Sequence, residues 1–162
     1  MIRSLAVAFA AAGGLIIAAP APACTLCAGN VQATVTLRQD AANAKLILYG
    51  TLANPRLLQG DRGGVTELRI EHVLKPDPFL GDKKVIELPR YIPIDPKEPP
   101  KFLVYCSIFK DKLDPYRGVP VKSPEMVDYL KGALALDAKD TTAQLFYYFR
   151  YLDHADAEIA GD

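Results

Sequence analysis

The 162-residue sequence has no tryptophan, two histidines, three cysteines and no net charge, because 19 basic residues balance 19 acidic ones. Proteins that bind nucleic acid or an anionic membrane surface usually carry an excess of positive charge, and this chain has none. Three cysteines allow at most one intramolecular disulfide, which excludes a disulfide-rich scaffold. What the chain has instead is proline, thirteen in all, which predicts a body with many loops.

The motifs of several enzyme classes are also missing. No serine stands in Gly-x-Ser-x-Gly, and neither Gly-x-x-x-x-Gly-Lys nor Gly-x-Gly-x-x-Gly occurs. His72 and His154 lie far apart in the sequence without a Glu-x-x-His or similar spacing, so we interpret both as turn or surface residues rather than ligands or bases. We therefore predict a protein that is not an enzyme and that carries no cofactor or metal.

The longest apolar run lies at the N-terminus. It covers residues 5–19, follows Arg3, and ends in Ala21-Pro22-Ala23 just before Cys24. A basic start, a short apolar core and a small-x-small site are the parts of a secretory signal peptide, here residues 1–23. Because the run is shorter than the roughly 20 residues that span a bilayer, we predict cleavage and no transmembrane anchor. The chain is thus expected in the periplasm, at the cell surface or outside the cell.

A cysteine at the first mature position also raises the alternative of a lipid anchor on Cys24. Lipoprotein signal peptidases usually require a larger aliphatic residue three positions before the cysteine, where this chain has Ala21, and Pro22 is unusual at the next position. We therefore favour export without a lipid. About 140 residues remain after cleavage, enough for one ordinary core or for a small domain with an appendage.

The mature chain first shows strand patterns and then helical ones. Strands are predicted at residues 44–52, 65–75, 83–89 and 101–109, with a bulge at His72-Val73-Leu74 where alternation breaks. Four prolines exclude a central strand at 90–100, and residues 110–121 read as a turn.

Helices are expected at the two ends of this region. Residues 37–43 form a short helix or turn, and a helix starts at Ser123 as cap with Pro124 as its first residue. Asp140 caps a helix over 141–152, and Asp153 or Asp156 starts a third. Because that third helix has fewer than two turns, we expect the chain to be a fragment or a truncated product. The sequence predicts a mainly β fold, a small barrel or sandwich over 24–121 followed by a helical segment over 122–162.

The order of these pieces resembles the netrin-like domains, which include the tissue inhibitors of metalloproteinases. The resemblance lies in a cysteine at the mature N-terminus, in "AKLILYGTL", in a strand ending "HVLK" and in "KFLVYCSIF". The layout is also similar to uncharacterised bacterial secreted proteins with Cys-x-x-Cys after the signal, this barrel, and HEAT-like helix pairs. The resemblance implies an OB-fold barrel whose N-terminal cysteine is tied to the body by a disulfide. Animal inhibitors begin with Cys-x-Cys and carry many more cysteines, whereas this chain has Cys24-Thr25-Leu26-Cys27.

The cysteines admit three interpretations. We favour a disulfide from Cys24 or Cys27 to Cys106, because export leads to an oxidising compartment. A redox centre would need a strand before Cys24, and the sequence has none there. A structural zinc site would need a histidine beside the three thiolates. The redox centre and the zinc site both remain alternatives to the disulfide.

Two further segments are candidates for binding. Asp114, Tyr116 and Arg117 form either a recognition patch or a turn in which Arg117 pairs with Asp114, and we favour the turn. The stretch "LFYYFRYL" at residues 145–152 has more aromatic side chains than one helix face holds, so it packs in the core or binds a partner.

The leading hypothesis is therefore an exported protein-binding module whose protein partner is unidentified. In a specific version, a free N-terminal Cys24 inhibits a protease by chelating its zinc with the α-amino group and carbonyl. The alternative is a thiol redox or metal-binding protein that uses Cys24, Cys27 and Cys106.

Overall fold

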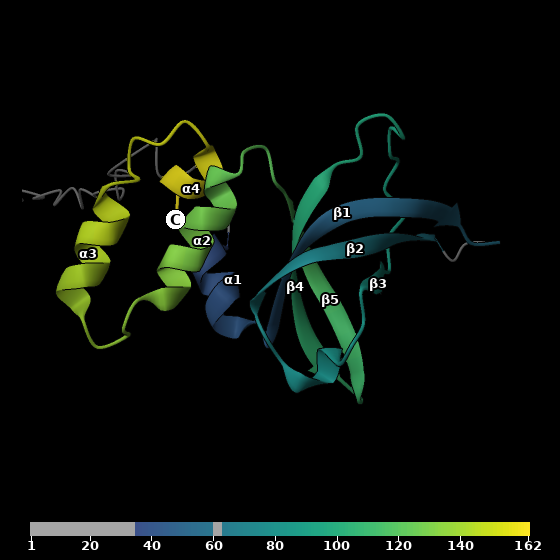
Figure 1. The fold of residues 1–162 in the computed structure, drawn as a ribbon, viewed down its shortest axis with the longest axis horizontal. Coiled ribbons are helices and arrows are strands. Elements are labelled where there is room, and N and C mark those ends of the chain that lie inside the picture. Colours follow the sequence, from purple (N-terminus) through teal and green to yellow (C-terminus); the bar gives the residue numbers. More distant parts are fainter. Residues whose placement is uncertain (1–34, 60–62) are drawn as a thin grey trace, which may run out of the picture. The chain divides into compact units, whose positions relative to one another are not determined.

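The computed structural model describes residues 35–59 and 63–162, so the predicted signal peptide, Cys24 and Cys27 lie outside the described residues. Five strands form one antiparallel sheet in the order β3-β2-β1-β4-β5 (Figure 1). The strands are β1 (Leu46–Leu57), β2 (Gly64–Lys75), β3 (Val85–Leu88), β4 (Lys101–Phe109) and β5 (Lys112–Pro120). A mainly β fold is confirmed. Within the described residues the sheet is open, with β3 and β5 as its edges, so a closed barrel is not formed.

The four predicted strands are all present, and β5 is the strand that the sequence did not reveal. Its dipeptides Asp114-Pro115 and Arg117-Gly118 are typical of turns, yet both lie inside the strand. The turn instead falls at Lys110 and Asp111, whose φ angles of 48° and 55° form a two-residue hairpin loop. Pairing with the strongly apolar β4 therefore outweighs the local turn preference of β5.

Strand β1 is buried on both faces and contributes to two hydrophobic clusters. Ile47 and Tyr49 belong to the helix-side cluster, which lies between the sheet and the helices. Leu46, Leu48 and Leu52 belong to the strand-side cluster on the opposite face. Side chains from both edge strands contact the strand-side cluster, including Ile86 and Leu88 of β3 and Leu113 of β5. The sheet must therefore curve around this cluster, which brings its two edges toward each other.

Irregular pairing between β1 and β2 accompanies this curvature. The register shifts at three points, one of them at Leu74, which confirms the predicted bulge. Gly50 makes the close approach of the two backbones feasible, because a Cβ atom there would lie 2.0 Å from the Arg69 carbonyl oxygen.

Four α-helices and one 3-10 turn, η1 (Pro78–Leu80), complete the described chain. The helices are α1 (Leu37–Asn43), α2 (Glu125–Ala135), α3 (Thr141–Phe149) and α4 (Ala157–Ala160). The predicted caps Asp140 and Asp156 are confirmed, because their carboxylates accept from the backbone N–H groups of Ala143 and Glu158. The predicted cap Ser123 is wrong: Pro124 holds the capping position, and no side chain within the described residues caps α2. None of the described helices is long and apolar enough to cross a bilayer.

We predict that Gly50→Ala destabilises the protein by more than about 2 kcal/mol, because the added Cβ forces β1 and β2 apart. Gly118→Ala in β5 is the matched control. Its Cβ would lie 3.3 Å from the Phe102 ring, which can move aside, so its effect is expected to stay below about 1 kcal/mol. Urea unfolding measures the free energy of unfolding of both variants. An equal loss of stability in the two would contradict the close approach of β1 and β2 at Gly50.

Candidate functional site

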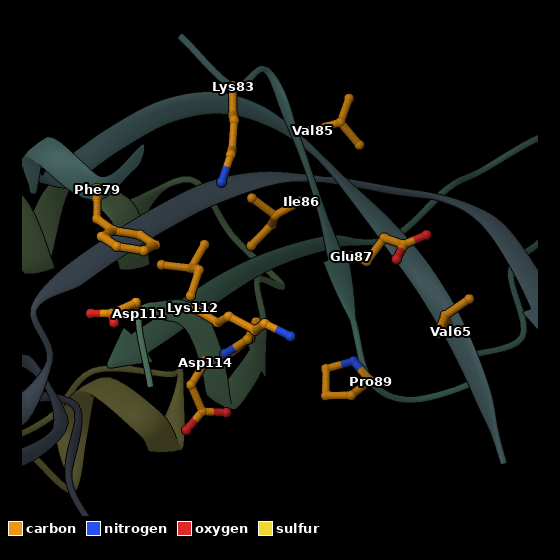
Figure 2. Close-up of a pocket in the computed structure, with 12 residues that line it drawn as sticks. Val65, Phe79, Lys83, Val85, Ile86, Glu87, Pro89, Asp111, Lys112 and Asp114 are labelled. Carbon is orange, nitrogen blue, oxygen red and sulfur yellow. The ribbon is translucent and has the colours of Figure 1, made fainter. Parts of the chain in front are cut away.

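A cleft of about 670 Å³ lies between the two edge strands of the sheet (Figure 2). One wall is β3 with the neighbouring residues Lys83 and Pro89, and the other is the start of β5 with Asp111 of the hairpin loop. The volume falls within the roughly 300–1,000 Å³ of typical ligand-binding pockets. The curvature of the sheet thus creates a site from segments that are distant in the sequence.

The cleft combines apolar surface with charges of both signs. Phe79, Val85, Ile86, Leu113 and Pro115 supply apolar groups. The charged residues that line it are Lys83, Lys112, Glu87, Asp111 and Asp114. Such a lining has no strong preference for a cation or an anion, and it fits a ligand with both apolar and polar parts.

Strand β3 turns toward this cleft backbone groups that its ladder with β2 does not use. The Ile70 N–H donates to the Lys84 carbonyl oxygen at 2.9 Å, so the backbone of Lys84 faces β2. Because successive residues of a strand alternate in direction, Val85 and Glu87 turn their N–H and C=O groups away from β2. Both residues line the cleft.

Strand β5 does the same from the opposite wall. Phe109 and Lys112 flank the two-residue hairpin loop as a hydrogen-bonded pair, so Leu113 and Pro115 turn their backbone groups away from β4. Pro115 has no N–H to donate to β4. Its position therefore agrees with the rule that a proline in an edge strand has its nitrogen on the side away from the ladder. The cleft therefore exposes backbone groups of Val85, Glu87, Leu113 and Pro115.

A second cleft of about 280 Å³ adjoins the first along the same two edges. It is lined by Leu88 to Arg90 on one side and by Pro115 to Gly118 on the other. Pro89 and Pro115 line both clefts, so the two are parts of one seam.

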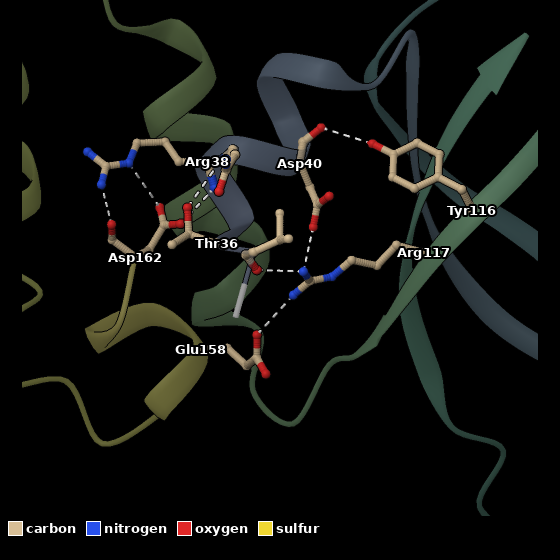
Figure 3. A network of polar contacts seen from close by, with 9 residues as sticks. Thr36, Arg38, Asp40, Tyr116, Arg117, Glu158 and Asp162 are labelled. Carbon is tan, nitrogen blue, oxygen red and sulfur yellow. Dashed lines mark hydrogen bonds and ion pairs between the residues drawn. The ribbon is translucent and has the colours of Figure 1, made fainter. Parts of the chain in front are cut away.

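The predicted binding residues Asp114, Tyr116 and Arg117 line this seam, but their side chains have different partners. Asp114 lines the first cleft and accepts from the Ser107 hydroxyl at 3.2 Å. Tyr116 and Arg117 line the second cleft and reach helix α1, where the Tyr116 hydroxyl donates to the Asp40 carbonyl at 3.2 Å. Arg117 pairs with Asp40 rather than with Asp114, at 2.6 Å between Nη1 and Oδ2 (Figure 3).

The Arg117–Asp40 pair connects the edge of the sheet to the helices. Arg117 also donates to the Val35 carbonyl at 2.5 Å and lies 3.5 Å from a carboxylate oxygen of Glu158. Burial raises the pKa of Asp40 above 3.8, and the positive charge of Arg117 opposes that rise. Asp40 is 4% exposed, so its buried charge is stabilised by the Arg117 guanidinium.

A second polar contact holds the helices together beside this pair. The Asp162 carboxylate accepts from the Arg38 backbone N–H at 2.7 Å and from the Tyr129 hydroxyl at 2.5 Å (Figure 3 draws the Arg38 contact). Burial and the neighbouring Asp162 both raise the pKa of Tyr129. These contacts join α1, α2 and the residues that follow α4, so they position the helices rather than line the seam.

The described residues include one cysteine, Cys106, which is buried in the strand-side cluster. Burial, and to a smaller extent the charge of Asp114, raises the pKa of its thiol to about 12. The disulfide, redox and metal predictions also involve Cys24 and Cys27, which lie outside the described residues. Within residues 35–59 and 63–162, no group of three His, Cys, Asp or Glu side chains could hold a metal ion.

The two histidines have local partners. The His72 ring stacks on Tyr49 with ring centroids 5.9 Å apart, and His154 Nδ1 accepts from the Asp156 N–H at 3.0 Å. Neither lines the seam between β3 and β5.

We predict that Arg117→Gln destabilises the protein by about 2 kcal/mol at neutral pH, because the Asp40 charge stays buried without its partner. The pKa of Asp40 is raised in the folded state, so ionising it costs stability as the pH rises above 3.8. The deficit should therefore shrink as the pH falls toward 3.8, because the raised pKa of Asp40 favours protonation of its carboxyl over that range. Urea unfolding at several pH values measures it.

The double variant Asp40→Asn/Arg117→Gln should lose this pH dependence, because the titrating group is gone. Arg56→Gln is the matched control. The Arg56 side chain is 53% exposed, so we expect the loss of its pairs with Glu67 and Glu87 to cost less than about 1 kcal/mol. A deficit in Arg117→Gln that does not change with pH would contradict the role given to Asp40.

Comparison with known proteins does not assign the chain to a family. No family model, no curated protein and no solved structure matches the chain. The seam and its contacts are therefore the basis on which a function is proposed.

Proposed function

We propose that the chain is an exported protein-binding module that takes an extended segment of a partner protein between β3 and β5. The observation that carries this proposal is the pair of strand edges that line the first cleft and that no other strand of residues 35–59 and 63–162 pairs with. Addition of a strand to an exposed sheet edge is a recurrent mode of peptide recognition, in which backbone hydrogen bonds give affinity and side-chain pockets give specificity.

The direction of the strands supports one added segment that pairs with both edges. Every ladder of the sheet is antiparallel, so β3 and β5 run in the same direction. A segment between them can alternate its N–H and C=O groups between Val85 and Glu87 on one side and Leu113 on the other. Pro115 offers only a carbonyl, so pairing with β5 centres on Leu113.

The same arrangement supports an OB-like barrel as the finer description of the fold. The order β3-β2-β1-β4-β5 is that of a five-stranded barrel in which one ladder, between β3 and β5, is missing. The partner segment would bridge this gap. Binding of the partner segment would also cover the edges of β3 and β5, so that they no longer pair with other chains and cause aggregation.

The lining indicates the chemistry of the partner segment. Side chains of an extended segment alternate in direction, so every second residue faces the apolar side chains of Ile86 and Leu113, which both contact the strand-side cluster. We therefore propose a segment of about four to six residues with apolar side chains at alternate positions and polar ones between. Glu87, Lys112 and Asp114 would select among the polar positions.

Export rests on the N-terminal pattern of residues 1–23, so the partner is a protein of the same compartment. Protease inhibition through Cys24, and the redox or metal alternative, depend on residues outside the described part of the chain and stay predictions.

The test uses a display library of random peptides of about eight residues, selected on the purified chain and measured by fluorescence anisotropy. We expect peptides that alternate apolar and polar residues. Val85→Pro should weaken their binding at least about tenfold, because it removes an N–H that faces the cleft and that β2 does not use.

Val85→Ala is the matched control, because it trims the side chain and keeps the N–H. We expect it to weaken binding less than about threefold. Methylation of the peptide backbone nitrogens should abolish binding while the side chains stay the same. Equal effects of Val85→Pro and Val85→Ala, or full binding of the methylated peptide, would contradict strand addition.

A further inference from the structure

We infer that the outer face of α3 binds a second copy of this chain, with the two α3 helices antiparallel. Four large apolar side chains on or next to this helix are exposed to between 56% and 73%: Leu145, Phe146, Phe149 and Leu152. Contiguous exposed apolar side chains on one helix face mark an interaction surface, whereas scattered ones are ordinary. This surface, called here the α3 face, contains no residue that lines the seam.

The opposite side of α3 is already occupied. Tyr147, Tyr148 and Tyr151 contact Tyr129 of α2, with ring centroids 4.8 to 6.4 Å from it. The Tyr147 hydroxyl also donates to the Tyr129 carbonyl at 2.7 Å. The helix is thus anchored by its tyrosine side, and its apolar side faces outward as a preformed surface.

The α3 face has a recess beside its exposed rings. A groove of about 350 Å³ is lined by Ala143, Phe146 and Phe149, together with Leu136, Tyr147 and Arg150. Ala143 is the small residue in this lining, so a large side chain of another helix can lie over it.

The charges near the ends of α3 argue for a second copy as the occupant. Lys139 and Asp140 are exposed at the start of the helix, and Arg150 and Asp153 are exposed at its end. In an antiparallel pair, Lys139 lies near Asp153 of the other copy and Asp140 near Arg150. Both pairs join opposite charges. The sequence midpoint is Phe146 for the first pair and Leu145 for the second, so one alignment of the two helices brings both pairs close together. A parallel pair would instead bring like charges together.

That alignment also fits the apolar side chains. With Phe146 of the two copies opposite each other, Phe149 of one copy lies over Ala143 of the other, where the groove is. The contact is self-complementary, so it closes as a two-fold dimer and does not extend into a filament.

The available area indicates a small contact. An aromatic side chain carries about 150–250 Å² and a leucine somewhat less, so the four side chains, exposed to between 56% and 73%, offer roughly 500 Å² per copy. Stable interfaces bury about 800 Å² per partner. The contact is therefore smaller than a stable interface, so we expect a weak dimer.

Sedimentation velocity of the purified chain from about 5 to about 500 µM tests this inference. We expect a shift from monomer to dimer within that range, and Phe149→Glu should raise the dissociation constant at least about tenfold. Phe109→Glu is the matched control: Phe109 is 61% exposed at the end of β4, and its substitution should leave the dimer unchanged. Circular dichroism of each variant checks that it is folded.

A charge exchange tests the antiparallel alignment. Alone, Asp153→Lys and Lys139→Asp should each weaken the dimer, because each places like charges at both ends of the contact. A mixture of the two variants should form a heterodimer about as stable as the original dimer, since both pairs then have opposite charges.

A chain that stays monomeric over the whole range would overturn the inference, as would a dimer that Phe149→Glu does not weaken. Single variants that dimerise as tightly as the unmodified chain would overturn the antiparallel alignment, because a parallel pair has like charges at both positions with or without the substitution. Failure of the mixture to dimerise would overturn it too. Val85→Pro leaves the α3 face intact, so it should dimerise like the unmodified chain whatever its effect on peptide binding.

Discussion

Burial of β1 on both faces is the constraint on which the other elements depend. Ile47 and Tyr49 need a cover on one side, and Leu46, Leu48 and Leu52 need one on the other. Helices α1, α2 and α4 cover the first side with Leu37, Met126, Leu130 and Ile159. The second side is covered by the sheet itself, because β3 and β5 curve around the strand-side cluster. The facing edges, and so the cleft, follow from how this one strand is buried.

Two polar contacts keep this arrangement in place on the helix side. Arg117 of β5 reaches Asp40 of α1, and Asp162 joins Arg38 to Tyr129. The Arg117–Asp40 pair holds β5, one wall of the seam, against helix α1. It therefore ties the sheet that carries the seam to the helical part of the chain. The seam offers backbone hydrogen bonds to an extended segment, whereas the α3 face offers apolar area to a helix. One chain thus presents two surfaces of different chemistry.

The sequence predicts the elements better than the site they form. The apolar runs of β1 and β4 and the alternation of β2 are local signals, and so are the capping carboxylates of Asp140 and Asp156. Strand β5 was missed because Pro115 and Gly118 carry turn preferences, which pairing with β4 outweighs. Asp114, Tyr116 and Arg117 could be singled out as polar residues, but their partners come from distant segments. No local signal in the sequence indicates that Val85 and Leu113 line the same cleft.

Amide hydrogen exchange of the free chain tests most directly whether the edges of the sheet are open. The account predicts slow exchange for the amides of β1 and β4, which pair on both sides. The amides of Val85, Glu87 and Leu113 face the cleft, so they should exchange at least about a hundredfold faster. Protection of these three amides equal to that of β1 would mean that β3 and β5 are already paired, and it would contradict the open seam.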